Sequence, residues 1–445
     1  MRRKTHVPYG SRISTRDFLL HRSNALPPEK DKGRPAIGLK ELSARFPRMR
    51  MGKDFIDDAI MHLDAFLGFG ILLIRVDDFS GVEKISGREY AIRVLLDTAD
   101  SIDAVCSPAK GMWGLIERDM FGCFFPDGNA SVCIACAEKI RRYPGKIRQE
   151  SLTAGIAEYP FARFSRMESI QNARKALEQA MFSGPDSTAL FDAVTLNMSA
   201  DRLYQQGNVK GAIEEFKTAM LLNPSDGNIH NSLGVCYSVL GAYPSALEEF
   251  RTAARLLPDE PMPVYNIGLV HRLSGEKNLA MENFLRALAL APDVFETLFQ
   301  LGKLCLDRGD AEKSKSFFQK ALEIRPESGA AWRYLGKCCA VLDQTDEAVA
   351  AYRQAIRLKP DDAISLSALG WLYDLRGENP DIALSFCRHS VEIAPENGLF
   401  RQRLGQIYAR RNLLDEALAE FETANLMGCE SGEYIRKIHS MLHNQ

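Results

Sequence analysis

The chain has 445 residues, 26% of them charged, and a formal net charge of −2. This length predicts two or three domains, and the near balance of charge argues against a nucleic-acid partner. The longest apolar run, Ala65 to Ile74, is too short to cross a bilayer, so we expect no membrane span. The opening MRRKTHVPYG lacks the apolar core of a signal peptide, and the ten cysteines lack the spacing of a secreted disulfide framework. We therefore expect a cytoplasmic protein with reduced thiols.

Residues 1–37 are predicted to form a basic, flexible arm. Basic residues outnumber acidic ones in this segment, and Pro27, Pro28 and Pro35 interrupt it. Such an arm could contact an acidic partner or a membrane surface. A disordered tail explains the same composition, so the role of the arm stays open.

Residues 38–192 do not repeat. Runs of β-branched residues alternate with stretches of helical periodicity, which predicts an α/β domain. The expected helices are 55–67, 89–101, 131–142 and 167–182. The expected strands are 70–76, a hairpin made of 114–116 and 121–125, and then 152–157 and 188–191.

Four stretches of this domain resemble the diguanylate cyclase (GGDEF) family. They are ILLIRVDDFS at 71–80, GLIERDMFGCFFPD at 114–127, SLTAGIA at 151–157 and ARKALEQAMFSG at 173–184. The resemblance implies a cyclase-like α+β sandwich. It also implies that two Mg²⁺ ions would be held by an aspartate of the first strand motif and by acidic residues at the hairpin tip.

The residues on which that chemistry depends are replaced here. Arg75 stands at the position of the metal-binding aspartate, and the tip (117–121) reads ERDMF in place of GGDEF. The guanine-reading positions hold Glu83 and Lys84, and Met181 replaces the lysine that contacts phosphate. The resemblance therefore implies a catalytically inactive pseudoenzyme domain without a metal ion, and it argues against nucleotide binding.

Cys133 and Cys136 form a C-x-x-C, a spacing also found in zinc and redox sites. Cys106 and Cys123 could complete a set of four ligands, but no second C-x-x-C accompanies them. We interpret these cysteines as packing residues, because free cysteine behaves as a small hydrophobe. The eight histidines show no H-x-x-x-H pair. We therefore predict no catalytic, cofactor or metal site.

A glycine recurs at intervals of 34 residues along the rest of the chain. The series is Gly234, Gly268, Gly302, Gly336 and Gly370, followed by Gly405 after one extra residue. In most units a small residue, an aromatic residue, an alanine and a closing proline follow each glycine. This period predicts a stack of helix–turn–helix units whose small residues allow close helix approach. We count seven units over 193–430 and a capping helix over 431–445.

The unit at 329–362, GAAWRYLGKCCAVLDQTDEAVAAYRQAIRLKPDD, resembles the tetratricopeptide repeat (TPR) family. The resemblance implies an all-α, right-handed solenoid whose first helices line a concave groove that binds other proteins. The ligand-contacting positions of this groove are Tyr265, Asn266, Leu269, Arg272, Phe299, Lys303, Arg333, Tyr334, Lys337, Trp371, Arg403 and Arg410. Most of them are aromatic or basic, and such residues anchor interfaces and favour carboxylates or phosphates. We therefore expect the partner to be an acidic or amphipathic protein segment.

The first functional hypothesis is a bacterial protein–protein interaction scaffold that carries an inactive cyclase-like domain. One alternative is a regulator that senses a nucleotide or cyclic di-GMP, and another is an active diguanylate cyclase, which Arg75 argues against. Asp192 runs into the first repeat with almost no linker. We therefore also expect the two parts to pack rigidly.

Overall fold

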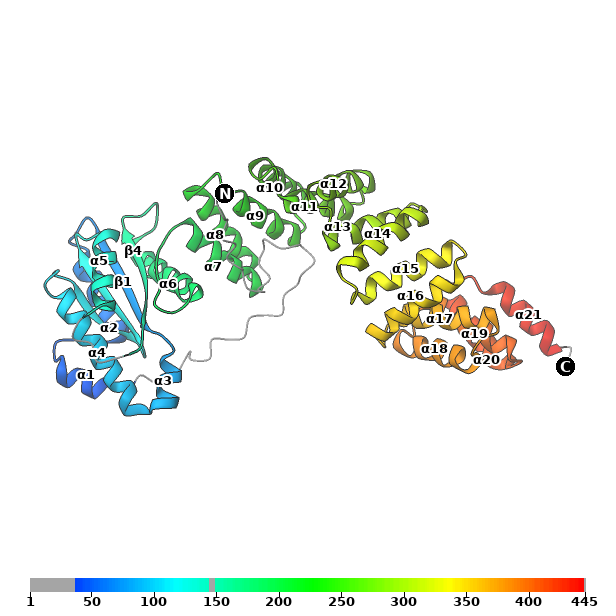
Figure 1. Ribbon diagram of the computed structural model, residues 1–445, viewed down its shortest axis with the longest axis horizontal. Helices are drawn as coiled ribbons and strands as arrows, with labels where there is room; N and C mark the ends of the chain where they lie inside the picture. The colour runs from blue at the N-terminus through cyan, green and yellow to red at the C-terminus, as the bar shows by residue number, and fades with distance from the viewer. Residues whose placement is uncertain (1–36, 144–148, 444–445) are drawn as a thin grey trace. The chain divides into compact units, whose positions relative to one another are not determined.

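The computed structural model describes residues 37–143 and 149–443, so the expected basic arm, apart from Ile37, lies outside the described residues. The chain divides into two compact units, one ending at Pro258 and the next beginning at Asp259. The first contains a sheet with its helices and the first helices of the repeat region, and the second contains helices α11 to α21 (Figure 1). None of the helices among these residues combines the length and apolar character needed to cross a membrane.

The first unit is built on a five-stranded mixed sheet. Its strands are β1 (Phe69–Val76), β2 (Met112–Glu117), β3 (Met120–Pro126), β4 (Leu152–Tyr159) and β5 (Thr188–Leu190). They lie in the order β2-β3-β1-β4-β5, with β1 antiparallel to both neighbours and β5 parallel to β4. All residues of the central strand β1 except Arg75 are buried.

Helices cover both faces of this sheet and make three layers. They are α1 (Leu39–Arg45), α2 (Gly52–Leu63), α3 (Phe79–Ser86), α4 (Arg88–Cys106), α5 (Ala130–Arg141) and α6 (Arg166–Ser183). Successive side chains of a strand point to opposite faces. Ile71 and Leu73 accordingly share a core with residues of α2 and α6, whereas Leu72 and Ile74 share one with residues of α4 and α5.

The expected strands and helices of this domain all form, with ends that differ by a few residues. The expected helix 55–67 ends at Leu63, and Leu67 is 92% exposed. Helices α1 and α3 are additional. The short α3 begins after Asp78, which has a left-handed conformation with φ 45°, so the sequence there has the character of a turn. The predicted α/β class is confirmed.

The first repeat helices pack directly on this domain. They are α7 (Ala193–Gln205), α8 (Val209–Leu222), α9 (Gly227–Val239) and α10 (Tyr243–Leu256). Asp192 caps α7 by accepting a hydrogen bond from a main-chain amide of its first turn. Leu196 of α7 shares a core with Leu177 of α6, and Lys175 Nζ of α6 lies 2.8 Å from Glu215 Oε1 of α8. The architecture therefore changes at Asp192 without a linker, and α7 to α10 belong to the same compact unit as the sheet.

The second unit consists of helix pairs and a terminal helix. Its helices are α11 (Pro261–Leu273), α12 (Lys277–Leu290), α13 (Phe295–Asp307), α14 (Ala311–Ile324), α15 (Gly329–Val341), α16 (Thr345–Leu358), α17 (Ala363–Arg376), α18 (Pro380–Ile393), α19 (Gly398–Arg410), α20 (Leu414–Leu426) and α21 (Gly432–His443). Each odd-numbered helix up to α19 packs against the next one, and α21 packs on α20. These pairs form the predicted helical solenoid, whose right-handedness stays a prediction.

The glycines of the 34-residue series lie against the second helix of the same pair. A Cβ atom on Gly302 would lie 2.8 Å from the ring of Phe318, which has no exposed surface. In the unit that lacks an aromatic residue, a Cβ atom on Gly370 would lie 2.8 Å from Cys387 Sγ. A larger side chain at these positions therefore forces the two helices apart or displaces the packed residue.

Gly302→Leu is expected to loosen the α13–α14 pair, because it overfills a packed contact. Overpacking costs roughly 1–3 kcal/mol, so hydrogen exchange of the α13 and α14 amides should accelerate by about 5- to 150-fold. Gly432→Leu is the control, since nothing lies within 4 Å of a Cβ atom there. Equal exchange rates in the two variants would show that the glycine contact does not limit helix packing.

Candidate functional site

Arg75, near the end of β1, is surrounded by carboxylates. Its Nη2 atom lies 3.1 Å from Glu117 Oε2, and its Nε atom lies 3.6 Å from Asp119 Oδ2. Arg174 of α6 forms a second ion pair with Glu117. Both acids belong to the β2–β3 hairpin, so its tip is held by two arginines.

The other charged groups of this hairpin are paired as well. Burial raises the pKa of Asp119, and the charge of Arg75 partly offsets that rise. Arg118 forms an ion pair with Glu83, one of the two predicted guanine-reading positions. The other, Lys84, is exposed. Within residues 37–143 and 149–443, no group of three or more His, Cys, Asp or Glu is arranged to hold a metal ion.

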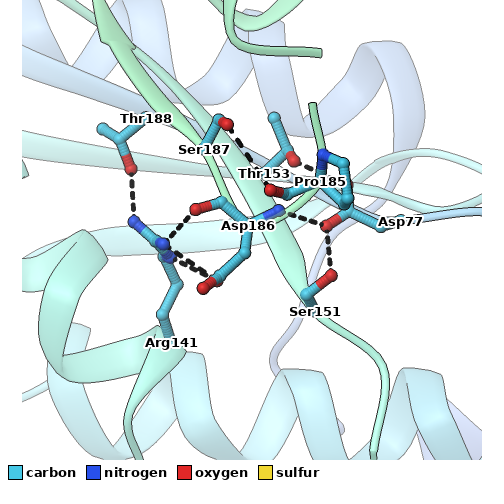
Figure 2. A network of polar contacts seen from close by, with 8 residues as sticks. All are labelled: Asp77, Arg141, Ser151, Thr153, Pro185, Asp186, Ser187 and Thr188. Atoms are coloured by element: carbon cyan, nitrogen blue, oxygen red, sulfur yellow. Dashed lines mark hydrogen bonds and ion pairs between the residues drawn. The ribbon is translucent and has the colours of Figure 1, made fainter. Parts of the chain in front are cut away.

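Asp77 follows directly on β1 and connects three segments of the chain (Figure 2). Its Oδ1 atom accepts a hydrogen bond from Thr153 Oγ1 at 2.5 Å. Its Oδ2 atom accepts one from Ser151 Oγ at 2.6 Å and one from the main-chain N–H of Asp186 at 2.9 Å. Arg141 Nε donates to Asp186 Oδ1 at 2.9 Å. Both oxygens of Asp77 are thus used to join β1 and β4 to the segment before β5, which is a structural role.

The C-x-x-C cysteines lie in the core together with two others. Cys133 and Cys136 of α5 are buried with Cys106 and Cys123, and all four are free thiols. Burial raises the pKa of Cys123, Cys133 and Cys136, so these thiols are uncharged at neutral pH. A Cβ atom on Gly70 of β1 would lie 2.5 Å from Cys133 Sγ. These contacts agree with the predicted packing role.

The predicted groove positions lie on the first helices of the pairs in the second unit. First helices of consecutive pairs contact each other, α13 with α15 and α17 with α19. Nine of the predicted residues are exposed or half-buried, and we call them the first-helix face. They are Arg272, Phe299, Lys303, Arg333, Tyr334, Lys337, Trp371, Arg403 and Arg410.

Three predicted groove residues are core residues instead. Tyr265, Asn266 and Leu269 of α11 are at most 1% exposed. The ring of Tyr265 packs against Phe284 of α12, with 5.3 Å between their centroids. Because their surfaces are covered, these side chains are not available to a partner in this structure, and we leave them out of the first-helix face.

Aromatic rings and cations alternate on the first-helix face. The Phe299 and Tyr334 rings meet edge to face at 5.6 Å. Lys303 Nζ lies 5.9 Å from the Phe299 centroid and 5.7 Å from that of Tyr334. The guanidinium of Arg403 lies 5.2 Å from the Trp371 ring. Each of these distances is within the range of a cation–π interaction, which holds the cation against the ring.

Some cations of this face already have carboxylate partners. Arg333 Nη1 donates to Asp362 Oδ1 at 2.6 Å, and Arg410 forms an ion pair with Asp374. The face is therefore less positive than the sequence predicts. Asp362 is the residue directly before α17, outside the first-helix positions on which the prediction was based.

Two family models, both described as tetratricopeptide repeats, match the helical region. One matches residues 197–261, 299–363 and 341–397, and the other matches residues 264–294. These segments are therefore tetratricopeptide repeats, and the family predicted for this part of the chain is confirmed. The matched residues all lie beyond the α/β domain.

Several solved structures align with part of the chain. YrrB, a TPR protein with an unusual peptide-binding site, is 20% identical and covers 42% of this chain and 96% of its own, with a TM-score of 0.38. MamA is 27% identical and covers 39% of this chain and 94% of its own, with a TM-score of 0.34. The pilF protein of Pseudomonas aeruginosa is 18% identical and covers 47% of this chain and 95% of its own, with a TM-score of 0.44. Among curated proteins, none matches this chain.

Arg75→Asp is expected to destabilise the first unit, because it removes two ion pairs and adds a carboxylate beside Glu117 and Asp119. We expect a loss of roughly 1–3 kcal/mol, less than for a fully buried pair because the Arg75 side chain is 24% exposed. Millimolar Mg²⁺ should recover part of this loss in a calorimetric melt. Arg75→Gln is the control, since it removes the cation without adding a charge and should gain no response to Mg²⁺. A variant as stable as the wild type would show that the ion pairs of Arg75 with Glu117 and Asp119 do not stabilise the hairpin.

Proposed function

We propose that the chain is a protein–protein interaction scaffold that binds a segment of another protein on the first-helix face. Tetratricopeptide repeats typically mediate protein–protein interactions, and the repeats here extend over much of the chain. The observation that carries the proposal is the composition of this face, where half-buried rings alternate with arginine and lysine. Aromatic residues and arginine dominate the energetics of interfaces because they bury a large area and also carry polar groups.

We further propose that the α/β domain is a degenerate cyclase-like domain without catalytic activity. The element order and the mixed sheet fit the four stretches that resemble this family. The proposed loss of activity is supported by the ion pairs of Arg75 with Glu117 and Asp119, which occupy the carboxylates that a metal ion would need. A cation approaching these acids would also be repelled by the guanidinium.

Photo-crosslinking on the first-helix face tests the scaffold proposal. A benzoylphenylalanine in place of Lys337, an exposed residue of α15, should crosslink to a specific protein in lysate of the source cells. The same probe in place of Gln319, an exposed residue of the second helix α14, is the control and should not. The Trp371→Ala variant should weaken the Lys337-position crosslink, because it removes a ring from the same face. Equal crosslinks from both probe positions would exclude the first-helix face as the binding surface.

Calorimetric titration tests the inactive-domain proposal. The full chain should be used, because the α/β domain shares one compact unit with α7 to α10. GTP with Mg²⁺ and cyclic di-GMP should each give no binding heat at high micromolar concentration, and GTP should yield no cyclic product. Saturable heat would favour the alternative of a nucleotide-sensing regulator, and product formation would overturn the pseudoenzyme interpretation.

A further inference from the structure

We infer that Lys303, flanked by Arg272 and Arg333, is the point on the first-helix face that binds an anionic group of the partner protein, either a carboxylate or a phosphoryl group. This inference rests on the proposed scaffold function and names the chemistry of its ligand. The three residues come from consecutive first helices, α11, α13 and α15. Lys303 Nζ and the Arg333 guanidinium both lie against the Tyr334 ring, 5.7 and 5.5 Å from its centroid.

The three cations act on one another. Burial lowers the pKa of Lys303, and the charges of Arg272 and Arg333 lower it further, while Asp307 opposes them. The ammonium group is half-buried and close to the Phe299 and Tyr334 rings. A lysine held between rings and beside two guanidinium groups loses hydration that an exposed lysine keeps.

The acids nearby do not neutralise this site. Arg333 is paired with Asp362, and Asp307 is exposed and forms no ion pair with Lys303. In the part of the chain that the structure describes, neither Lys303 nor Arg272 forms an ion pair with a carboxylate. Of the three cations, only Arg333 therefore has a carboxylate partner among the described residues.

One of the cations carries an unused polar atom. The Nε atom of Arg272 is buried and has no hydrogen-bond partner among the described residues. A buried polar atom without a partner costs stability, and an outward turn of the Arg272 side chain would let a bound oxyanion accept from its Nε–H.

This arrangement distinguishes a binding role from a structural one. If Lys303 only held the repeats together, removing its charge would destabilise the stack. If Lys303 instead serves binding, removing its charge should stabilise the free protein, because it relieves the repulsion from Arg272 and Arg333 and the cost of burying the ammonium group. Lys320 is the control, because it is an exposed lysine of the second helix α14 and lies outside the first-helix face.

The test uses the full chain with inorganic phosphate and acetate as probes, titrated calorimetrically against chloride at equal ionic strength. The wild type should bind one of the two anions saturably. Lys303→Met should weaken binding by about tenfold or more, since it removes one charge-assisted contact, and should melt at a higher temperature than the wild type without anion. Lys320→Met should change neither property. Preference for phosphate would identify a phosphorylated partner, and preference for acetate an acidic one.

The inference would be overturned if neither anion binds, if Lys303→Met melts at a lower temperature, or if both lysine variants lose binding equally. Its failure is distinguishable from that of the scaffold proposal. A specific crosslink at the Lys337 position with no anion binding would leave the scaffold and remove the anion site. Anion binding without any crosslinked protein would support the site and count against the scaffold.

Discussion

The contact between a glycine and the second helix of its pair is the constraint on which the repeat region depends. Where Gly302 meets Phe318, no side chain separates the helices, and the ring fills the space between them. Repetition of this contact sets each pair in a similar relation to the next. The same face of the first helix therefore recurs in every repeat. Its residues can change without altering the contacts between the paired helices.

Charge compensation differs between the two proposed sites. Around the β2–β3 hairpin, Arg75 and Arg118 each pair with acids, and the charges are balanced. Around Lys303 they are not balanced, and burial and repulsion lower the pKa of the lysine. The first arrangement pairs the acids of the hairpin tip with arginines. The second is the arrangement on which the proposed anion site rests.

Features that depend on nearby residues of the chain could be predicted from the sequence, whereas side-chain contacts between distant residues could not. The repeat period and the strand and helix order follow from spacing within each segment, and both are found in the structure. The burial of Tyr265 depends on Phe284 in the next helix, and the neutralisation of Arg333 depends on Asp362, 29 residues further along the chain. The helix α3 was missed because it is short and begins at a left-handed residue. Side-chain partners of this kind are determined by packing and leave no periodic signal.

The junction at Asp192 gives the α/β domain a second role. A stack of repeats needs both of its end faces covered. At the C-terminal end α21 provides this cover, and its Ile438 is 2% exposed. In the first unit, Leu196 of α7 shares a core with Leu177 of α6, so the α/β domain covers the first repeat. Its retention therefore has a physical reason that is independent of any chemistry it carries.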